Sequence, residues 1–412
     1  MERDDEPLTP SGRMFLRPEM DQIIHCVFGL GKPIDIQSIK DEMDRNMHIA
    51  HPKFTSLLVQ DRHGRHYWRK TQVNIDRHFI IINNHASSQL ITDEESVNDY
   101  LADLSISSPL PTDKPLWEFH VLVPNKCVVL RVHHALGDGI SLMALMLSGC
   151  RKANDPNNPL VLPTGGRYTF ERPRTIRNLV QATWITTRYV LEFIMRSLWM
   201  RDKTTSLSGG EGVELWPRKL ATAKFLLEDM KIVKRAVAGA VSRKNYLLDE
   251  LRLKKTVLSS GNMFGMLLLP VYYHKPDVGC SPLKHVEKIK EVMTKKKMSS
   301  EAYFSYKLGQ LAMSCFGPKA TSYMFNKVIK NTTFTISNVV GPQEDLTFAG
   351  HPIDYIRVTT TSLPHALTMH MVSYAGKAEM QILVAKDIIP DPQILAKYFE
   401  IALNEMKEAA KY

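Results

Sequence analysis

Alternating or continuous apolar runs along the chain predict strands. Residues 128–132 form one such run, and the uncharged residues 263–273 form another, which we interpret as a buried strand. Two further runs, 367–374 and 378–384, are joined by three residues that include Gly376. Because glycine tolerates the backbone angles of tight turns, these two runs predict a β-hairpin.

Apolar residues spaced three and four apart predict helices over residues 33–47, 176–200 and 392–410. The last helix is expected to bury one face, made of Ile394, Leu395, Tyr398, Phe399, Ala402 and Met406. In 176–200 the charged residues gather in one arc, so this segment is a poor candidate for crossing a membrane. Trp184 and Trp199 stand at the edges of that arc, where amphipathic rings would meet a lipid headgroup layer. The segment predicts either a helix on a membrane surface or a linker helix packed on its own protein.

The mixture of strand and helix patterns predicts an α/β fold rather than a pure β-sandwich. Residues 154–174 are rich in proline, glycine and asparagine, which is typical of an exposed connection. We therefore expect an N-terminal domain over residues 1–170, a linker that carries the amphipathic helix over 171–215, and a C-terminal domain over 216–412. With 412 residues the chain is long enough for two such domains.

Charge and composition narrow the classes of partner. The chain has 53 Lys and Arg against 43 Asp and Glu, and the net charge of +10 favours an anionic partner such as a membrane surface or a phosphorylated cofactor. Nucleic acid is not expected, because no recognised nucleic-acid-binding module accompanies the charge. The sequence has five cysteines without a C-x-x-C pair, and its charged N-terminus lacks a secretory pattern, so we expect a reducing compartment.

The string HHxxxDG, at residues 133–139, is the densest group of chemically active residues in the sequence. It lies between the strand predicted at 128–132 and a following helical pattern, a place where side chains project into a cleft. An imidazole with a pKa of about 6.5 is able to take a proton from an alcohol and return it to a leaving group. Adjacent histidines on an extended segment point to opposite faces, and we expect His134 to face the substrate because it stands four residues before Asp138. Two core histidines without a catalytic role are the alternative.

Other kinds of site find little support in the sequence. Opposite-facing neighbours such as His133 and His134 do not converge on one metal ion, so no metal is expected at the motif. The more distant histidine pairs have no cysteine partners and no H-E-x-x-H context. A P-loop, a Gly-rich dinucleotide fingerprint and a G-x-S-x-G nucleophile elbow do not occur either.

At the histidine motif the sequence resembles the CoA-dependent acyltransferase superfamily, and in particular the plant wax ester synthase/diacylglycerol acyltransferase family. The string HHALGDGISLM is similar to that family's active-site motif. DKPLWEFHVLV, which contains Pro115, Leu116 and Trp117, and TISNVVGP, residues 335–342, match two further family motifs. EPLTPSGRMF near the N-terminus and LPHALTMHMVSYAG near the C-terminus also resemble the family, so the likeness touches nearly the whole chain.

The resemblance implies two pseudo-symmetric domains similar to chloramphenicol acetyltransferase, each a mixed sheet flanked by helices, with an active-site channel between them. It also implies an O-acyltransferase that moves a fatty acyl group from acyl-CoA to a long-chain fatty alcohol, giving a wax ester, or to diacylglycerol, giving triacylglycerol. Acyl-CoA is then a co-substrate, and no further cofactor is expected. The expected location is the cytosolic face of the endoplasmic reticulum membrane, with the plasma membrane as an alternative.

Carried onto this sequence, the resemblance implies that His134 is the general base that removes the proton of the alcohol. Asp138 is implied to fix the loop rather than to relay a proton. His133 is expected to shape the other side of the strand. Gly139 completes the motif at the substrate-binding side and permits backbone angles that other residues resist.

Three further residues are candidates for substrate binding. Ser337 and Asn338 are candidate donors to the thioester oxyanion, and simple turn chemistry beside their Gly-Pro neighbour is the alternative. Trp117 is expected to pack in the core, with lining the channel as its functional role.

Residues 241–260 depart from the family pattern. The family usually carries a longer stretch here with an Asn-Asp signature, which this sequence lacks, so we expect the C-terminal domain to be shortened at this point. Two alternatives to a wax ester synthase follow: a catalytically weak, lipid-binding or membrane-associated relative, and a soluble acyltransferase for specialised alcohols. The second class is expected to carry a D-F-G-W-G motif near its C-terminus, which is absent from the sequence.

Overall fold

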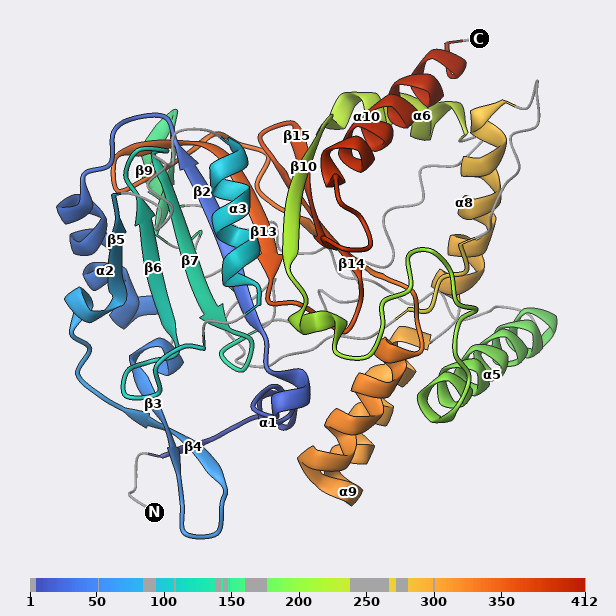
Figure 1. Cartoon of the computed structure of the whole chain (residues 1–412), viewed down its shortest axis with the longest axis horizontal. Coiled ribbons are helices and arrows are strands. Elements are labelled where there is room, and N and C mark those ends of the chain that lie inside the picture. The colour runs from blue at the N-terminus through green and yellow to red at the C-terminus, as the bar shows by residue number, and fades with distance from the viewer. Residues whose placement is uncertain are drawn as a thin grey trace.

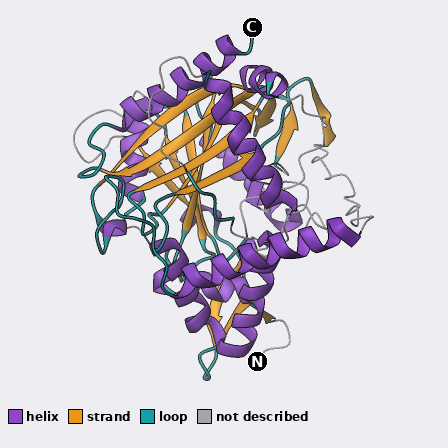
Figure 2. Cartoon of the chain, turned by 90° about the vertical axis from the view of Figure 1, so that its right-hand side faces the viewer, coloured by secondary structure: helices purple, strands orange, loops and turns teal. Residues whose placement is uncertain are grey.

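The computed structural model shows a mixed α/β protein in which two large sheets lie side by side and are flanked by helices (Figure 1). The structure describes residues 5–50, 52–83, 94–106, 109–137, 142–143, 147, 149–159, 176–237, 267–271, 281–298 and 301–411. Turned by 90°, the molecule shows its strands in the middle and helices around them (Figure 2). The α/β class predicted from the sequence is confirmed.

The larger sheet has eight strands in the order β5-β6-β7-β2-β13-β12-β8-β9. In that order the strands are Phe79–Ile82, Trp117–Leu122, Cys127–His133, Ile23–Leu30, His351–Thr360, Leu346–Phe348, Cys150–Lys152 and Asp155–Pro159. β5 and β6 pair in parallel, whereas the other neighbours are antiparallel. β12 and β13 come from the C-terminal half of the chain but pair with β8 and β2, so both halves contribute strands to this sheet.

Two further sheets, of four and three strands, complete the strands of the described residues. One has four strands in the order β10-β15-β14-β11, which are Arg218–Leu226, Lys377–Ala385, Leu367–Tyr374 and Thr335–Val340. Its edge strand β11 runs parallel to β14. The other has three strands in the order β1-β4-β3, which are Glu6–Pro7, His66–Lys70 and Ser56–Gln60. The hairpin of β3 and β4 projects from the lower end of the molecule (Figure 1).

Helices account for much of the remaining described chain. The α-helices are α1 Pro10–Phe15, α2 Ile36–Ala50, α3 Glu94–Leu104, α5 Ile176–Leu198, α6 Leu227–Ala236, α8 Pro282–Met298, α9 Glu301–Lys330 and α10 Pro392–Ala409. The short 3-10 helices are η1 Pro18–Met20, η2 Pro52–Thr55, η3 Ile75–His78 and η4 Val213–Leu215. α9 is bent at Gly317, whose non-helical backbone precedes Pro318. That break follows from the proline, which cannot continue the hydrogen-bonding pattern of a helix.

The two large sheets are held together by apolar packing between their facing sides. Val27 and Val129 of the eight-stranded sheet share one buried cluster with Leu220 and Leu383 of the four-stranded sheet. α3 takes part in the same cluster and also lies against β10. β13 is in contact with β14 and β15 in addition to its own sheet. Residues on these facing sides are therefore enclosed between the two halves of the chain.

Several local predictions are confirmed. β14 and β15 form the predicted antiparallel hairpin, and Gly376 in its turn has φ +78°, which favours glycine. The strand expected at 128–132 lies within β7. The helices expected at 33–47, 176–200 and 392–410 correspond to α2, α5 and α10.

Two predictions about apolar segments are wrong in part. α10 lies along β10 and β15 and turns Leu395, Phe399 and Leu403 toward them, whereas Ile394 and Tyr398 are 52% and 64% exposed. The spacing indicated a helix, but which strip is buried depends on the angle at which the helix meets the sheet. In 263–273 the described residues, 267–271, do not form a strand, and Val271 is exposed. The rest of that segment lies outside the described residues.

Candidate active site

His134 is the first residue after β7 and stands at the end of the eight-stranded sheet. Its backbone N–H donates to the carbonyl of Gln22 at 2.8 Å, which ties the start of the loop to the segment before β2. Its ring stacks on Phe15 of α1, with ring centroids 4.0 Å apart and an angle of 17° between the planes. The imidazole is half-buried, and its plane is set by an aromatic neighbour.

His133, the last residue of β7, has both ring nitrogens engaged. The backbone N–H of Ala135 donates to Nδ1 at 3.0 Å, so Nδ1 is the acceptor nitrogen. Nε2 therefore carries the proton, and it donates to the carboxylate of Asp21 at 2.8 Å. A ring held at both ends in this way shapes the turn that presents His134.

The rest of the motif is described only in part. Asp138 and Gly139, the predicted loop-fixing and substrate-binding residues, lie outside the described residues. Residues 142–143 and 147 are helical, as expected for the segment that follows the motif. The described turn, up to residue 137, closes with a hydrogen bond from the N–H of Leu136 to the carbonyl of His133 at 3.0 Å.

A second histidine, His370, reaches the same region from β14 of the four-stranded sheet. Burial and, to a lesser extent, the charge of nearby His134 lower the pKa of His370 to about 4. The side chain is buried, and its Nδ1 has no hydrogen-bond partner among the described residues. The two histidines come from opposite halves of the chain, so the candidate site draws on both.

His370 was not predicted from the sequence as a site residue. It lies in LPHALTMHMVSYAG, which is apolar apart from isolated polar positions and is typical of a buried strand. The sequence does carry a signal for a site residue here. A histidine stands inside an apolar strand, and imidazoles are rarely buried without a hydrogen-bond partner. Which face of β14 would turn toward the eight-stranded sheet was not readable from the sequence.

Ser337 and Asn338 lie next to each other on β11 and point to opposite sides of the sheet. Along β11 half-buried and exposed residues alternate, and Ser337 is half-buried whereas Asn338 is exposed. In the parallel pairing with β14, Ser337 is the register partner of His370. Register partners project from the same side of a sheet, so Ser337 lies beside His370 and Asn338 points away from it.

The Gly-Pro pair that follows β11 has a packing role. The N–H of Gly341 donates to the carbonyl of Ser373 on β14 at 3.0 Å. A Cβ at position 341 would lie 2.3 Å from that carbonyl oxygen, which is closer than real Cβ atoms come. Glycine is therefore required for β11 to approach β14 where the strand ends.

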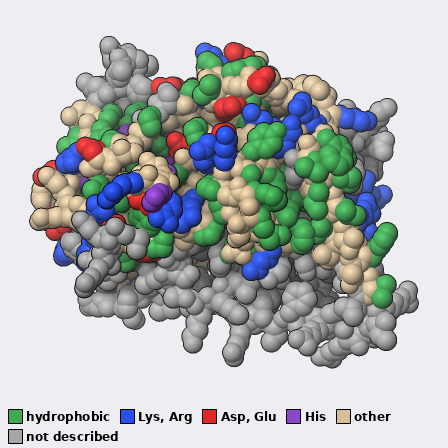
Figure 3. Space-filling view, turned by 90° about the horizontal axis from the view of Figure 1, so that it is seen from below, with side chains coloured by type: hydrophobic (Ala, Val, Ile, Leu, Met, Phe, Trp, Pro, Cys, Tyr) green, Lys and Arg blue, Asp and Glu red, His purple; other side chains and the backbone are tan. Residues whose placement is uncertain are grey.

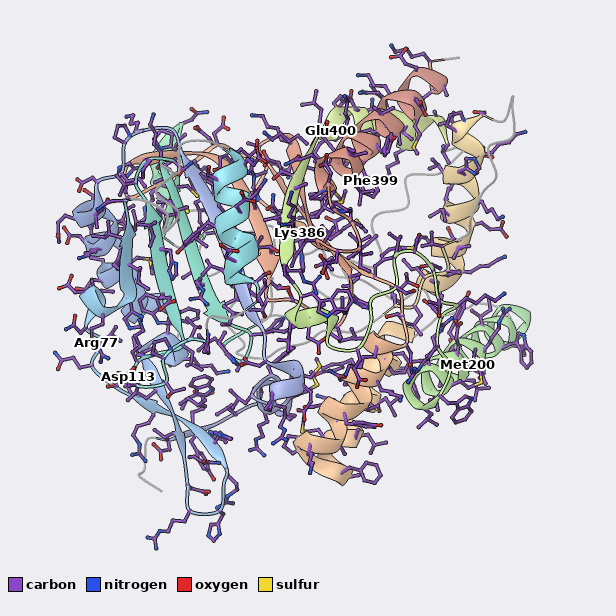
Figure 4. The ribbon with its side chains drawn as sticks, viewed as in Figure 1. Arg77, Asp113, Met200, Lys386, Phe399 and Glu400 are labelled. Carbon is purple, nitrogen blue, oxygen red and sulfur yellow. The ribbon has the colours of Figure 1, made fainter. Side chains whose placement is uncertain are left out.

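Trp117 is fully buried in the described structure. Its Nε1 donates to the carbonyl of Phe54 at 3.0 Å, and its ring stacks on His78 with centroids 3.7 Å apart. Figure 4 shows Arg77 and Asp113 close together at the edge of the molecule, where they form an ion pair of 2.5 Å. This pair ties the loop that precedes Trp117 to η3. The surroundings of Trp117 among the described residues are those of a core side chain.

A row of polar residues crosses the inner side of the eight-stranded sheet. The row comprises Glu118, Arg131, His25 and Thr359, which are register partners on β6, β7, β2 and β13. Arg131 forms an ion pair with Glu118 at 2.5 Å. Burial raises the pKa of Glu118, but the hydrogen bond with His120 and the charge of Arg131 outweigh it and bring that pKa to about 2. The charge of Glu118 is therefore kept inside the protein at neutral pH.

A separate cavity of about 670 Å³ opens between α3, β10, β13 and α10. Its lining includes Glu94, Lys224, Arg357 and Glu379, and His134 is not among the lining residues. Among the described residues, no three His, Cys, Asp or Glu side chains come together in a way that could hold a metal ion.

Comparison with known proteins identifies the family of this chain. A family model for the wax ester synthase/diacylglycerol acyltransferase catalytic domain matches residues 40–242, and the model for the WS/DGAT C-terminal domain matches residues 260–407. The chain belongs to the wax ester synthase/diacylglycerol acyltransferase family. It is therefore an acyltransferase, as the motifs at residues 133–139 and 335–342 indicated.

Relatives and solved structures agree with the family. Wax ester synthase/diacylglycerol acyltransferase 11 of Arabidopsis thaliana is 28% identical over 98% of this chain and 95% of its own length. Wax ester synthase/diacylglycerol acyltransferase 2 of the same plant is 29% identical over 98% and 96%. The wax ester synthase/diacylglycerol acyltransferase from Marinobacter aquaeolei VT8 is 17% identical, with a TM-score of 0.58 over 98% of this chain and 100% of that chain. The first condensation domain of the CDA synthetase has a TM-score of 0.57 at 14% identity over 98% and 96%. The two-domain fold expected from the resemblance is thereby confirmed.

Proposed function

We propose that this protein transfers a long-chain acyl group from acyl-CoA to a long-chain fatty alcohol, giving a wax ester, and that it also acylates diacylglycerol to triacylglycerol. The observation that carries the proposal is the position of His134 at the end of β7, where its half-buried ring is stacked on Phe15. Family membership supports the reaction class, and the fixed, half-buried ring of His134 supports its role as general base.

The proposed reaction follows from the chemistry of a neutral imidazole. His134 removes the proton of the alcohol while the alcohol oxygen forms a bond to the thioester carbonyl carbon, and the carbonyl electron pair moves onto oxygen. When the tetrahedral intermediate collapses, the carbonyl forms again and the carbon–sulfur bond breaks. The proton held by His134 then passes to the leaving thiolate of CoA, which restores the base.

An activity assay with the full chain tests this proposal. Palmitoyl-CoA is supplied with hexadecanol in one arm and with dioleoylglycerol in the other, and ester product and free CoA thiol are both measured. We expect His134→Ala to lower the rate by a factor of about 10² to 10⁴, the usual contribution of a general base. The control is His63→Ala, because His63 is an exposed histidine in the β3–β4 turn.

The results of this assay distinguish between the competing functions. Equal product from the wild type and His134→Ala would end the assignment of His134 as the base. An absence of product from the folded wild type would favour the catalytically weak, lipid-binding relative. Product from short specialised alcohols, but not from hexadecanol or dioleoylglycerol, would favour the soluble acyltransferase.

Attachment to a membrane surface is the second part of the proposal, since both acceptor lipids reside in membranes. α5 exposes large apolar side chains along one face, and α9, which packs against α5, exposes more. Together they form what we call the apolar patch: Val180, Trp184, Leu191, Leu198, Trp199, Leu311, Phe316 and Tyr323. Figure 3 shows apolar side chains gathered on the underside of the molecule, with basic side chains beside them. None of the described helices is both long enough and apolar enough to cross a bilayer.

The apolar patch has the composition of a peripheral membrane-binding face. Phe316 is 75% exposed and Trp184 is 70% exposed, and such rings are favourable at the boundary between headgroups and acyl chains. The exposed Arg188 and Lys319 on the same two helices would meet anionic headgroups. We place the protein by this face on the cytosolic side of the endoplasmic reticulum membrane or, alternatively, on the plasma membrane.

Flotation with phosphatidylcholine vesicles that contain phosphatidylserine tests the attachment. We expect the wild type to float with the vesicles, and the double variant W184E/F316E to remain in the soluble fraction. The control is Tyr398→Glu, because Tyr398 is equally exposed but lies on α10 at the opposite end of the molecule (Figure 1). Equal flotation of the wild type and W184E/F316E would contradict attachment through the apolar patch.

A further inference from the structure

A row of four residues crosses the inner side of the four-stranded sheet. The row comprises Ser337, His370, Gln381 and Thr222, which are register partners on β11, β14, β15 and β10. Gln381 donates through Nε2 to the hydroxyl of Thr222 at 2.7 Å, and Thr222 in turn bonds to Asn98 of α3. The β10 end of the row is thus held by hydrogen bonds.

His370 differs from the other buried histidine of its strand region. His365 precedes β14 and is buried too, but its ring is hydrogen-bonded to Thr332 and Thr335 at 3.0 and 3.1 Å. His370 keeps 8% of its surface accessible, and its buried Nδ1 has no partner among the described residues. A buried polar atom without a partner costs folding free energy. Such a cost points to a group that receives its partner from a ligand.

The protonation state of His370 suits a hydrogen-bond donor beside a general base. Burial and the nearby charge of His134 lower the pKa of His370 to about 4, so the ring is neutral at neutral pH. A neutral imidazole keeps one N–H and one lone pair, and a neutral histidine is known to polarise a carbonyl in enzymes. Because His370 carries no charge, it does not oppose the proton that His134 takes from the alcohol.

We propose that His370 is a second catalytic residue, whose ring N–H holds the thioester oxygen as that oxygen becomes negatively charged, with the hydroxyl of Ser337 as a second donor. This inference rests on the proposed function. In the step concerned, the alcohol oxygen bonds to the carbonyl carbon, its proton passes to His134, and the carbonyl electron pair moves onto the oxygen that His370 and Ser337 hold. That pair returns when the carbon–sulfur bond breaks, and the CoA thiolate takes the proton from His134.

The geometry also distinguishes Ser337 from its neighbour Asn338 as a candidate oxyanion donor. Asn338 lies on the exposed side of β11, so it does not reach the side of the sheet on which His370 lies. Ser337 stands directly beside His370 in the register. The pair of oxyanion donors that we infer is therefore one residue from β11 and one from β14, rather than two consecutive residues of β11.

Steady-state kinetics with palmitoyl-CoA and hexadecanol test the proposal. We expect His370→Leu, which removes the N–H, to lower kcat by a factor of about 10² to 10³ with little change in KM, as for the loss of one oxyanion donor. His370→Gln keeps a neutral N–H donor of similar size and should recover at least part of that loss. Ser337→Ala should lower kcat less, and the double variant S337A/H370L should lose less than the product of the two single losses.

A pH profile separates a catalytic role from a structural one. His370 is neutral at neutral pH, so H370L should lower the plateau of kcat without moving the acid limb of the profile. The matched control is His365→Gln, which removes a buried histidine that is already hydrogen-bonded. It should lower the thermal midpoint but leave kcat near the wild-type value.

The outcomes distinguish a failure of this inference from a failure of the proposed function on which it rests. A wild-type kcat in H370L, or H370Q as impaired as H370L in two folded proteins, overturns the role of His370 while the function stands. If H370L does not fold, H370Q and S337A decide: wild-type kcat in both overturns the proposal, and reduced kcat at unchanged KM supports it. A folded wild type that makes no ester overturns the proposed function and this inference together.

Discussion

The ring of Phe15 lies against the ring of His134, with centroids 4.0 Å apart and planes 17° from parallel. Phe15 is the buried last residue of α1, and α1 packs against α9. The string EPLTPSGRMF near the N-terminus thus contributes the side chain that fixes the plane of the motif histidine. A segment far from the motif in sequence therefore helps to build the site.

Replacing Phe15 by leucine should reduce catalysis more than stability. The change roughly conserves volume and should cost less than about 1.5 kcal/mol of unfolding free energy. Loss of a stack worth about 0.5–1.5 kcal/mol should lower kcat by a factor of about 2 to 10. The control is Met14→Leu, since Met14 is an equally buried neighbour on α1. If kcat values of the two variants agree, the stack does not orient His134.

The two hydrogen bonds of His133 should differ in importance. Asp21 has a side chain that is 48% exposed, so Asp21→Asn should change kcat by less than about threefold, as expected for a weak surface pair. His133→Leu removes the acceptor of the Ala135 N–H, next to His134, and leaves a buried donor without a partner. That change should lower kcat by at least about tenfold. Comparable kcat values for the two variants would contradict a positioning role for His133.

Arg357 of β13 should be important for joining the two sheets. It is buried and forms ion pairs of 2.5 Å with Glu379 of β15 and with Glu94 of α3. Arg357→Met leaves the half-buried Glu379 without its partner and should lower the unfolding free energy by about 3 kcal/mol, measured by denaturant titration. The double variant R357M/E379Q should recover part of that loss.

The exposed pair of Arg77 and Asp113 is the control for Arg357 (Figure 4). Its side chains are 51% and 66% exposed, so Arg77→Met should cost less than about 1 kcal/mol. Equal destabilisation by R77M and R357M would show that the burial of the Arg357 ion pairs contributes nothing to the unfolding free energy.

Acid should destabilise the fold through its buried histidines. The pKa values of His78, His365 and His370 fall from 6.5 to about 4, with burial as the largest cause. Between these values the unfolded chain binds protons that the folded chain does not, so stability is lost as pH falls from 6.5 toward 4. Glu118 adds a further loss below 4.5, because its folded pKa is about 2.

Denaturant titrations at about pH 7 and about pH 4.5 measure this loss. H370Q and H365Q each remove one such histidine, so each should reduce the loss of unfolding free energy by on the order of 2 kcal/mol. His63→Gln is the control, since His63 is exposed. An unchanged pH dependence in both buried-site variants would contradict the neutral state of these rings.

Much of the fold was readable because it depends on local patterns. The hairpin of β14 and β15 followed from two apolar runs around Gly376, and α2, α5 and α10 followed from helical spacing. The buried face of α10 was not readable, because Leu395 and Ile394 are neighbours on one helix and only the packing angle decides between them. The pairing of β13 with β2 of the N-terminal half could not be predicted either, since pairing between strands far apart in the chain leaves no local pattern in the sequence.

By itself, the sequence determined the family and singled out the candidate motif at residues 133–139, because residue types and short spacings carry that information. The tertiary structure decided which distant side chains lie near His134: Phe15 from α1, which stacks on its ring, and His370 from β14, which interacts with it electrostatically. It also put Ser337 and Asn338 on opposite sides of β11. The physical reason is that alternate residues of a strand face opposite sides, and the side that becomes the inside is set by the partner that covers it.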